Sequence, residues 1–400
     1  MLINIEPLKK YPQFRYLFIG QMVSFLGSMI SYVALPYQVY ELTKDNSLVG
    51  LIGLTQFVPV LIFGLLGGTF ADRLNRRKLL MYSEILMSFL VFGLMLNAFQ
   101  EKPSIAVIFG IVAFMQSVLG FHRPAMEAMT QVLVDPKDYA SIGALSSFRY
   151  SFGAIAGPAL AGLIIAKFGV KIAFAVDVAT YVVAVFCIYL LAPMADPVKS
   201  DKSALADAKE GLKFAVSKPE LIGTYLIDIV AMIFAFPTAL FPAMSEIWGG
   251  AAAAGVLFSA MATGSLIMTL FSGWTAKITS HGKGVVIAAG IWAVGIVLVG
   301  FSNSLWMAFL FLALAGGADM ISAIFRGVIW NRTVPNQLRG RLSGIEMISY
   351  MSGPLLGNAR AGWVASQFSV KFSLYSGGLI CFVAVIITAL FLPKFWKYQG

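Results

Sequence analysis

The sequence predicts an all-α membrane protein with twelve transmembrane helices in two pseudo-symmetric six-helix bundles. Hydrophobic residues make up 59% of the chain and charged residues only 12%, about half the charged share of a soluble domain. A chain of this composition has too few polar side chains to cover its surface in water. Long apolar segments recur along the chain, and its second half repeats features of its first.

Twelve segments reach the roughly 20 apolar residues that a helix needs to cross the hydrocarbon core of a bilayer. They are 16–39, 48–71, 79–99, 104–121, 142–166, 172–192, 221–244, 252–276, 284–301, 304–325, 342–366 and 372–392. The connections between them are short and polar, except for a lysine-rich stretch after the sixth segment. The sequence therefore predicts an N-terminal bundle (1–192), a cytoplasmic linker (193–220) and a C-terminal bundle (221–400).

The distribution of basic residues predicts the orientation of the chain. If the N-terminus is placed in the cytoplasm, most of the 29 Lys and Arg fall on the cytoplasmic side. Both termini of a multi-pass protein of the bacterial inner membrane are therefore expected in the cytoplasm. The net charge of +10 follows from this topology and does not indicate a nucleic-acid partner. The first segment is too long for the core of a signal peptide, so we expect it to be retained.

Glycines recur at a fixed offset between the two halves. Three glycines, Gly153, Gly157 and Gly162, are followed 200 residues later by Gly353, Gly357 and Gly362. Six segments followed by six in the same orientation form a parallel repeat, which is typical of transporters that bind substrate near the midplane between two bundles. The repeat predicts alternating access of one central site to the two sides of the membrane.

The connection between the second and third segments, Gly68–Lys78, reads G-T-F-A-D-R-L-N-R-R-K. It resembles the G-x-x-x-D-[RK]-x-G-[RK]-[RK] loop of the major facilitator superfamily, with Asn75 in place of the usual glycine. Asn tolerates the left-handed backbone that such a glycine provides. The resemblance implies that this loop meets the start of segment 342–366 and acts as a cytoplasmic gate. The expected gate residues are Gly68, Asp72, Arg73, Arg76, Arg77, Lys78 and Arg341.

We expect Asp72, with Arg341 nearby, to latch the two halves together on the cytoplasmic side. The alternative is that these charges only anchor the chain at the cytoplasmic surface. Three further stretches narrow the resemblance. Phe121–Val134 resembles the macrolide-efflux branch, whereas Leu8–Arg15 and Leu338–Gly344 resemble the enterobactin-exporter branch. The resemblance implies export of a small amphipathic molecule, a siderophore first and a macrolide or other drug second, in exchange for protons.

The segment 142–166 carries Gly153, Gly157, Pro158 and Gly162, which resemble the G-x-x-x-G-P antiporter motif. Small residues allow close helix packing, and the proline frees a backbone carbonyl and bends the helix. Because Gly and Pro are common in membrane spans, packing alone is the alternative. Segment 104–121 lacks the arginine that many proton-coupled antiporters carry there, which puts proton coupling by that route in doubt.

Ionisable residues within the apolar segments are candidates for substrate or proton binding, because each charge at mid-bilayer costs at least about 2.5–3.5 kcal/mol without water or a partner. The deeper ones are Asp228, Asp319, Arg149 and Arg360, and the first two lie on helices that line the cavity in the family that the chain resembles. Either could carry a proton. The alternative is a structural Asp–Arg pair. Glu84 and Glu346 are expected near the cytoplasmic basic network.

Polar side chains also align on single helix faces. Gln21, Ser24, Ser28 and Ser31 share one face of the first segment, as Asp319, Ser322 and Arg326 do farther along the chain. Either a hydrated cavity wall or hydrogen bonding between helices explains them. Both histidines, His122 and His281, are expected in loops. Because the sequence has no clustered metal ligands and no phosphate-binding loop, we expect no metal, cofactor or enzymatic activity. We also expect a monomer. A membrane enzyme and a non-transporting sensor remain the alternative classes.

Overall fold

The computed structural model describes residues 4–194, 210, 212–335 and 338–399. Within this range, the side chains at 64–73, 340–341, 343–345 and 347–349 are outside the description. Every regular element in the described ranges is a helix. Eleven of these helices are long and apolar enough to cross a membrane, and α14 (Arg339–Gln367), with 29 residues, is a further long helix. The predicted all-α membrane fold is therefore confirmed, with eleven or twelve candidate membrane helices in the described residues.

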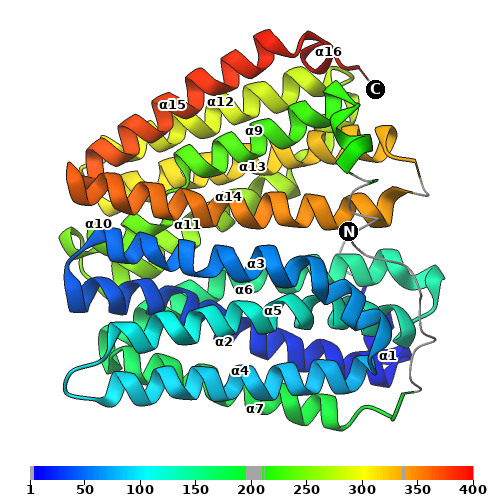
Figure 1. Cartoon of the computed structure of the whole chain (residues 1–400), viewed down its shortest axis with the longest axis vertical. Coiled ribbons are helices and arrows are strands. Elements are labelled where there is room, and N and C mark those ends of the chain that lie inside the picture. Colours follow the sequence, from blue (N-terminus) through cyan, green and yellow to red (C-terminus); the bar gives the residue numbers. More distant parts are fainter. Residues whose placement is uncertain (1–3, 195–209, 211, 336–337, 400) are drawn as a thin grey trace. The chain divides into compact units, whose positions relative to one another are not determined.

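The chain divides into two compact units. The first consists of Met1–Gln38 with Val58–Lys202, and the second of Val39–Phe57 with Ser203–Gly400. The helices that begin in the N-terminal part are α1 (Glu6–Lys10), α2 (Pro12–Thr43), α3 (Asn46–Arg73), α4 (Arg76–Phe99), α5 (Ile105–Leu133), η1 (Pro136–Asp138), α6 (Tyr139–Phe168) and α7 (Val170–Tyr189) (Figure 1). Within the first unit, α4 packs against both α5 and α7.

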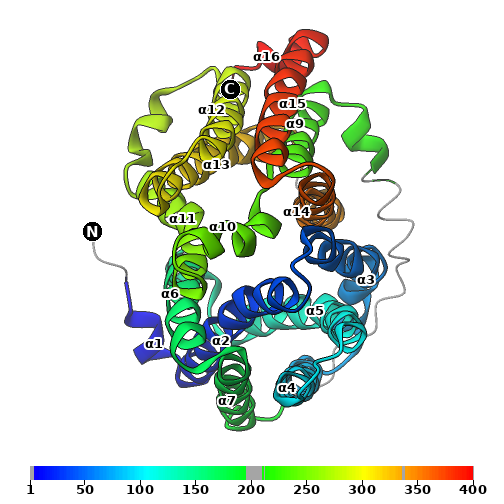
Figure 2. The ribbon, with the colours of Figure 1, turned by 90° about the vertical axis from the view of Figure 1, so that its left-hand side faces the viewer.

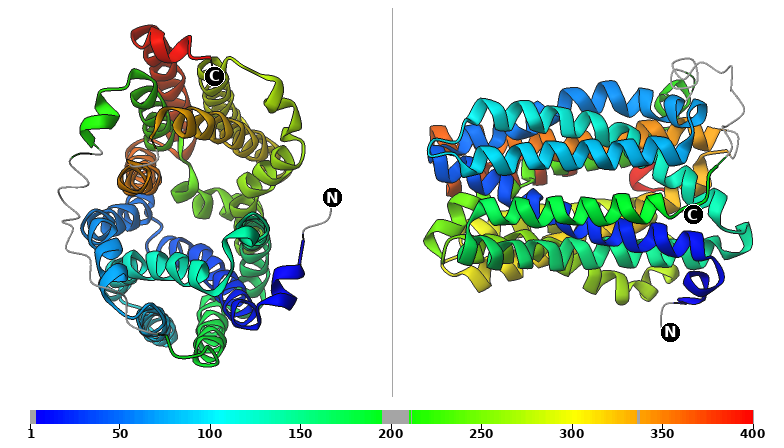
Figure 3. Two further views of the ribbon diagram at one scale, coloured as in Figure 1. Left: turned by 90° about the vertical axis from the view of Figure 1, so that its right-hand side faces the viewer. Right: turned by 90° about the horizontal axis from the view of Figure 1, so that it is seen from below.

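The second unit contains the remaining helices and short 3-10 turns. They are α9 (Pro219–Ala235), η2 (Thr238–Leu240), α10 (Phe241–Ile247), α11 (Ala251–Leu270), η3 (Ser272–Lys277), α12 (His281–Gly300), α13 (Leu305–Thr333), α14, α15 (Val370–Phe391) and α16 (Pro393–Trp396). Within this unit, α13 packs against α11 and α12, and α9 packs against α14 and α15 (Figure 2). The two views of Figure 3 show the helices end-on and lengthwise.

Two of the predicted segments are interrupted. The predicted segment 221–244 ends as a helix at Ala235, and Phe236 adopts an extended backbone with φ −89° and ψ 117°. Pro237 follows, and a residue before proline is disfavoured in the helical region. The predicted segment 252–276 ends as an α-helix at Leu270 and continues as the 3-10 turn η3.

The glycines of the sequence repeat make equivalent contacts in the two units. A Cβ on Gly157 of α6 would overlap the Met29 side chain of α2, and Pro158 and Gly162 are buried beside it. In the second unit, a Cβ on the corresponding Gly357 of α14 would overlap the Met232 backbone carbonyl of α9. Small residues therefore allow the fifth long helix of each repeat to pack closely against the first.

Residues 39–57 belong to the second unit because they contact α10 and α14. Lys44 forms a 2.9 Å ion pair with Glu246 of α10, and the Tyr40 hydroxyl donates to the same carboxylate at 3.0 Å. A Cβ on Gly362 of α14 would lie 2.8 Å from the Gly50 Cα of α3. The backbones of α3 and α14 are thus in direct contact here, which only glycine permits.

Candidate functional site

An arginine on α13 joins two carboxylates in the second unit. The Arg326 guanidinium pairs with Asp228 of α9 through Nη1, and its Nη2 lies 3.4 Å from the Asp319 Oδ1. Asp319 and Arg326 are two turns apart on the same face of α13. We call Asp228, Asp319 and Arg326 the arginine-bridged cluster. It brings together two predicted candidates and a base from the predicted polar stripe.

The two carboxylates of this cluster differ in their surroundings. The Asp228 side chain is 10% exposed and directly paired, whereas the Asp319 side chain is 36% exposed and makes the longer contact. Glu346 of α14 also interacts electrostatically with Arg326 and Asp228. Because a guanidinium does not deprotonate in proteins, Arg326 is a fixed positive charge. Asp228 is positioned to hold it, and Asp319 is the carboxylate with more access to water or substrate.

Two other predicted candidates in the second unit lie apart from these ion pairs. Ser322 is buried on the same face of α13 as Asp319 and Arg326. Arg360 of α14 donates to the backbone carbonyls of Phe234 at 3.1 Å and Ser373 at 2.9 Å, and to the Ser376 hydroxyl at 2.8 Å. These acceptors lie on α9 and α15. The Arg360 contacts therefore tie three helices together.

In the first unit, Glu84 of α4 is fully buried and is the centre of a polar cluster. Its Oε1 accepts from Gln21 Nε2 at 2.6 Å and lies 2.8 Å from His122 Nε2, and its Oε2 accepts from Ser24 at 3.2 Å. We call Glu84, His122, Gln21 and Ser24 the Glu84 cluster. It links α2, α4 and α5 by side-chain hydrogen bonds.

The sequence did not predict this cluster, and the predicted loop position of His122 is wrong. His122 was expected in a loop, but α5 continues through Pro124 to Leu133 and carries His122 in its membrane-spanning length. His281 likewise begins α12. The polar stripe on the first segment and the deep Glu84 were both visible in the sequence. The missing information was the extension of α5, which brings the histidine onto the same polar surface.

Asp177 of α7 forms a second buried acidic centre in the first unit. Its carboxylate accepts from the hydroxyls of Ser31 and Thr180, and Ser28 lies 2.9 Å from the Tyr181 hydroxyl. Gly27 permits this approach, because a Cβ there would overlap Thr180. All four side chains of the predicted stripe on α2 thus hydrogen-bond to neighbouring helices.

Arg149 of α6 lies between polar and aromatic groups of the first unit. Its Nη1 is 3.4 Å from the Met126 Sδ, and its guanidinium lies 5.9 Å from the centre of the Phe25 ring. It interacts electrostatically with Glu84. Among the described side chains, no carboxylate lies within ion-pair distance of it. Arg149 is therefore a partly buried positive charge, and the carboxylate that acts on it electrostatically is Glu84.

The predicted cytoplasmic gate lies largely outside the described side chains. This applies to Gly68, Asp72, Arg73 and Arg341, although their backbones belong to α3 and α14. Asn75 is described and corrects one expectation. Its φ is −60°, so it is not left-handed; its side chain instead accepts from the Lys78 N–H and caps α4.

The basic residues after Asn75 begin α4. Arg77 donates to the backbone carbonyls of Ile188 and Tyr189 at the end of α7, at 3.3 and 2.8 Å. The last carbonyls of a helix lack partners within the helix, so this arginine caps α7. Arg76 and Lys78 lie in the first turn of α4.

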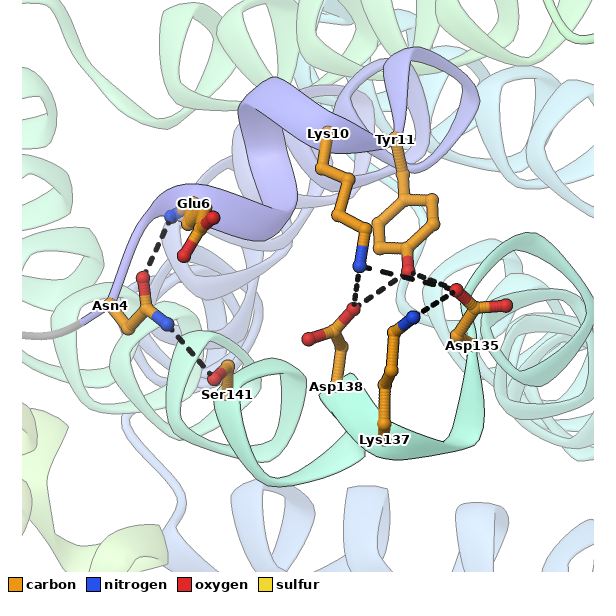
Figure 4. A network of polar contacts seen from close by, with 8 residues as sticks. All are labelled: Asn4, Glu6, Lys10, Tyr11, Asp135, Lys137, Asp138 and Ser141. Carbon is orange, nitrogen blue, oxygen red and sulfur yellow. Dashed lines mark hydrogen bonds and ion pairs between the residues drawn. The ribbon is translucent and has the colours of Figure 1, made fainter.

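An exposed charge network fixes the N-terminus to the connection between α5 and α6 (Figure 4). Lys10 forms a 2.6 Å ion pair with Asp138, and the Tyr11 hydroxyl lies 2.8 Å from Asp135 and 2.7 Å from Asp138. The hydrogen bond to Asp138 raises the pKa of Lys10 above its ordinary value. Hydrogen bonds from Tyr11 and Lys137 lower the pKa of Asp135. We call these residues the N-terminal clamp.

The family model described as "Transmembrane secretion effector" of the major facilitator superfamily matches residues 4–398. The chain belongs to this family. The members are transporters, so the chain is a multi-pass membrane transporter. The enterobactin exporters EntS of Shigella boydii serotype 4 (strain Sb227) and Escherichia coli O1:K1 / APEC are each 24% identical to it over 403 residues, which cover 100% of this chain and 96% of the relative.

Solved transporters show the same fold at low sequence identity. The structure of the nucleoside transporter NupG matches with a TM-score of 0.75 at 13% identity, over 96% of this chain and 99% of NupG. A bacterial homologue of the iron transporter ferroportin matches with a TM-score of 0.73 at 12% identity, over 98% and 100% of the two chains. The chain therefore has the major facilitator fold.

Proposed function

We propose that the chain exports a small amphipathic siderophore from the cytoplasm by alternating access, in exchange for protons, with both termini in the cytoplasm. The full-length similarity to enterobactin exporters supports the cargo class. The observation that carries the proposed exchange is the arginine-bridged cluster, because ionisable groups buried in membrane helices are costly and occur mainly along ion and substrate pathways.

Within this cluster we assign the proton to Asp319 and the structural role to Asp228. Asp319 has the more exposed side chain and the longer contact with Arg326. A proton on Asp319 weakens that contact, whereas Asp228 stays paired and keeps the guanidinium compensated. Loading and release of the proton then changes the net charge of the cluster without leaving Arg326 alone in the membrane.

The experiment compares two probes in proteoliposomes that contain the purified full chain. Iron-free enterobactin and erythromycin are each offered on the cytoplasmic side, with and without a pH gradient. The proposal expects gradient-driven transport of enterobactin, which Asp319→Asn abolishes. Transport of erythromycin alone would instead identify a macrolide efflux pump, in agreement with the resemblance of Phe121–Val134 to that branch. Transport of neither probe would overturn the proposal.

A cellular experiment tests the physiological role. Deletion of the gene should lower the siderophore secreted under iron limitation. Unchanged secretion together with a higher sensitivity to antibiotics would favour drug export.

A further inference from the structure

The Glu84 cluster contains a histidine that faces a fully buried carboxylate. Gln21 and Ser24 donate to Glu84 in every protonation state, but His122 is a charged donor only when it binds a proton. Histidine is the side chain that gains and loses a proton near physiological pH. The His122 side chain is 15% exposed and Glu84 is 0% exposed, so the imidazole is the more accessible member of the pair.

A comparison of the two units distinguishes this histidine from its counterpart. The helices α5 and α13 begin and end 200 residues apart, so His122 corresponds to Ser322 and lies one turn before the position of Arg326 on the same face. Both units therefore place a base from this helix opposite a membrane-buried carboxylate. The base of the second unit keeps its charge permanently, and the base of the first unit can lose it.

The surroundings of Glu84 compensate its charge when His122 is neutral. Arg149 from α6 interacts electrostatically with Glu84 and supplies a permanent positive charge. From α7, Asp177 and Tyr181 also face this region, where hydroxyl groups hydrogen-bond to each of them.

The neighbouring charges on α5 are occupied elsewhere. Arg123 pairs with Glu127 at 3.4 Å in an exposed position. The proton on His122 is therefore an additional charge that the cluster can gain or lose, while Arg149 remains as the counter-charge of Glu84.

We propose that Glu84 and His122 form a proton-binding site in the first unit, and that a proton bound and released there in each cycle contributes to the energy of export. This inference rests on the proposed export function. A proton from water binds the imidazole, and the protonated Nε2 donates to Glu84 Oε1. Release returns the same proton to water on the other side of the membrane, with no change of covalent bonds or electrons.

The first experiment measures how many protons are exchanged for each substrate. In proteoliposomes, the logarithm of the enterobactin accumulation ratio is plotted against the pH difference, and its slope equals that number. His122→Arg keeps a base beside Glu84 but makes it permanently charged, as in the second unit. We expect this variant to exchange labelled for unlabelled enterobactin as the wild type does, while the slope falls by about one.

The matched control is His281→Gln, which changes the other histidine of the chain and should leave the slope unchanged. Glu84→Gln should lower the slope as His122→Arg does. A wild-type slope in both variants, with exchange intact, would overturn the proposal. Loss of exchange in His122→Arg would identify a structural role of the neutral imidazole and would also overturn it.

A second experiment does not depend on transport. The chain has two histidines, so NMR of protein with labelled imidazole gives two signals, and His281→Gln identifies that of His122. We expect the His122 signal to change as the pH is varied, and that change to differ in Glu84→Gln. If the wild type transports neither probe, the export function fails, and this titration alone decides the proton site. A His122 signal that does not titrate, or that ignores Glu84→Gln, would refute it.

Discussion

Replacement of Asp228 should destabilise the second unit more than replacement of Asp319. In Asp228→Asn, the partly buried Arg326 loses its directly paired charge and keeps its 3.4 Å contact with the partly exposed Asp319 and its weaker attraction to Glu346. Breaking a buried ion pair on one side costs about 3–5 kcal/mol, and the remaining carboxylates place this variant near the lower end of that range. In Asp319→Asn the directly paired Asp228 remains, and a pair of that exposure contributes about 0–1 kcal/mol.

The free energies of unfolding can be compared by denaturant titration of the purified protein in lipid-detergent micelles. Asp228→Asn with Arg326→Gln should recover part of the loss, because the guanidinium left without its directly paired carboxylate is removed, while Asp319 loses only its longer contact. The double-mutant cycle gives the interaction energy of the pair. Equal losses for Asp228→Asn and Asp319→Asn, or a double variant less stable than Asp228→Asn alone, would refute this explanation of the cluster.

Three further predictions concern other parts of the chain. Asp72→Asn should leave the protein folded, as shown by a monodisperse elution profile, but should impair transport; unchanged transport would remove the proposed latch. Gly157→Val should lower the free energy of unfolding by about 1–3 kcal/mol, because its side chain overlaps Met29, whereas Gly143→Ala, with open space around it, should cause no loss. The N-terminal clamp should resist proteolysis equally from about pH 5 to 9. The pKa of Lys10 is raised, so its contact is lost only when the pH rises through that raised pKa, above about 10.4. The pKa of Asp135 is lowered, so its contact is lost only when the pH falls through that lowered pKa, below about 3.9. If cleavage within the residues that precede Pro12 increased between pH 6 and 8, that result would contradict the clamp.

The fold could be predicted from the sequence because the bilayer imposes a minimum length on every apolar helix. The family could be predicted because the loop Gly68–Lys78 carries a specific pattern. Helix ends were less predictable, since a segment that is apolar throughout, such as 221–244, can include a break at Phe236–Pro237 without changing its composition. Pro237 was the sequence signal for this break, but the length of the apolar segment favoured one continuous helix.

The sequence could predict which residues belong to the candidate site, but not how they pair. The sequence singled out Asp228, Asp319 and Arg326 as intramembrane or face-sharing groups, but not that one arginine joins both carboxylates. In the first unit, the expected loop position of His122 concealed its contact with Glu84. Pairing depends on the rotation of each helix about its own axis, which packing against several neighbours sets and which no single segment records.

The break after α9 has a mechanical consequence within the second unit. Arg360 of α14 holds the Phe234 carbonyl before the break, and Asn358 of the same helix accepts from the Thr238 hydroxyl at 2.7 Å and the Ala239 N–H at 2.9 Å after it. Both ends of the interruption are therefore attached to a single neighbour. A tilt of α14 would therefore also move residues 236–240. Because α10 follows directly, the same tilt would shift Glu246 on that helix. The interruption thus couples the part of this span after Phe236 to α14 through hydrogen bonds on both sides of the break.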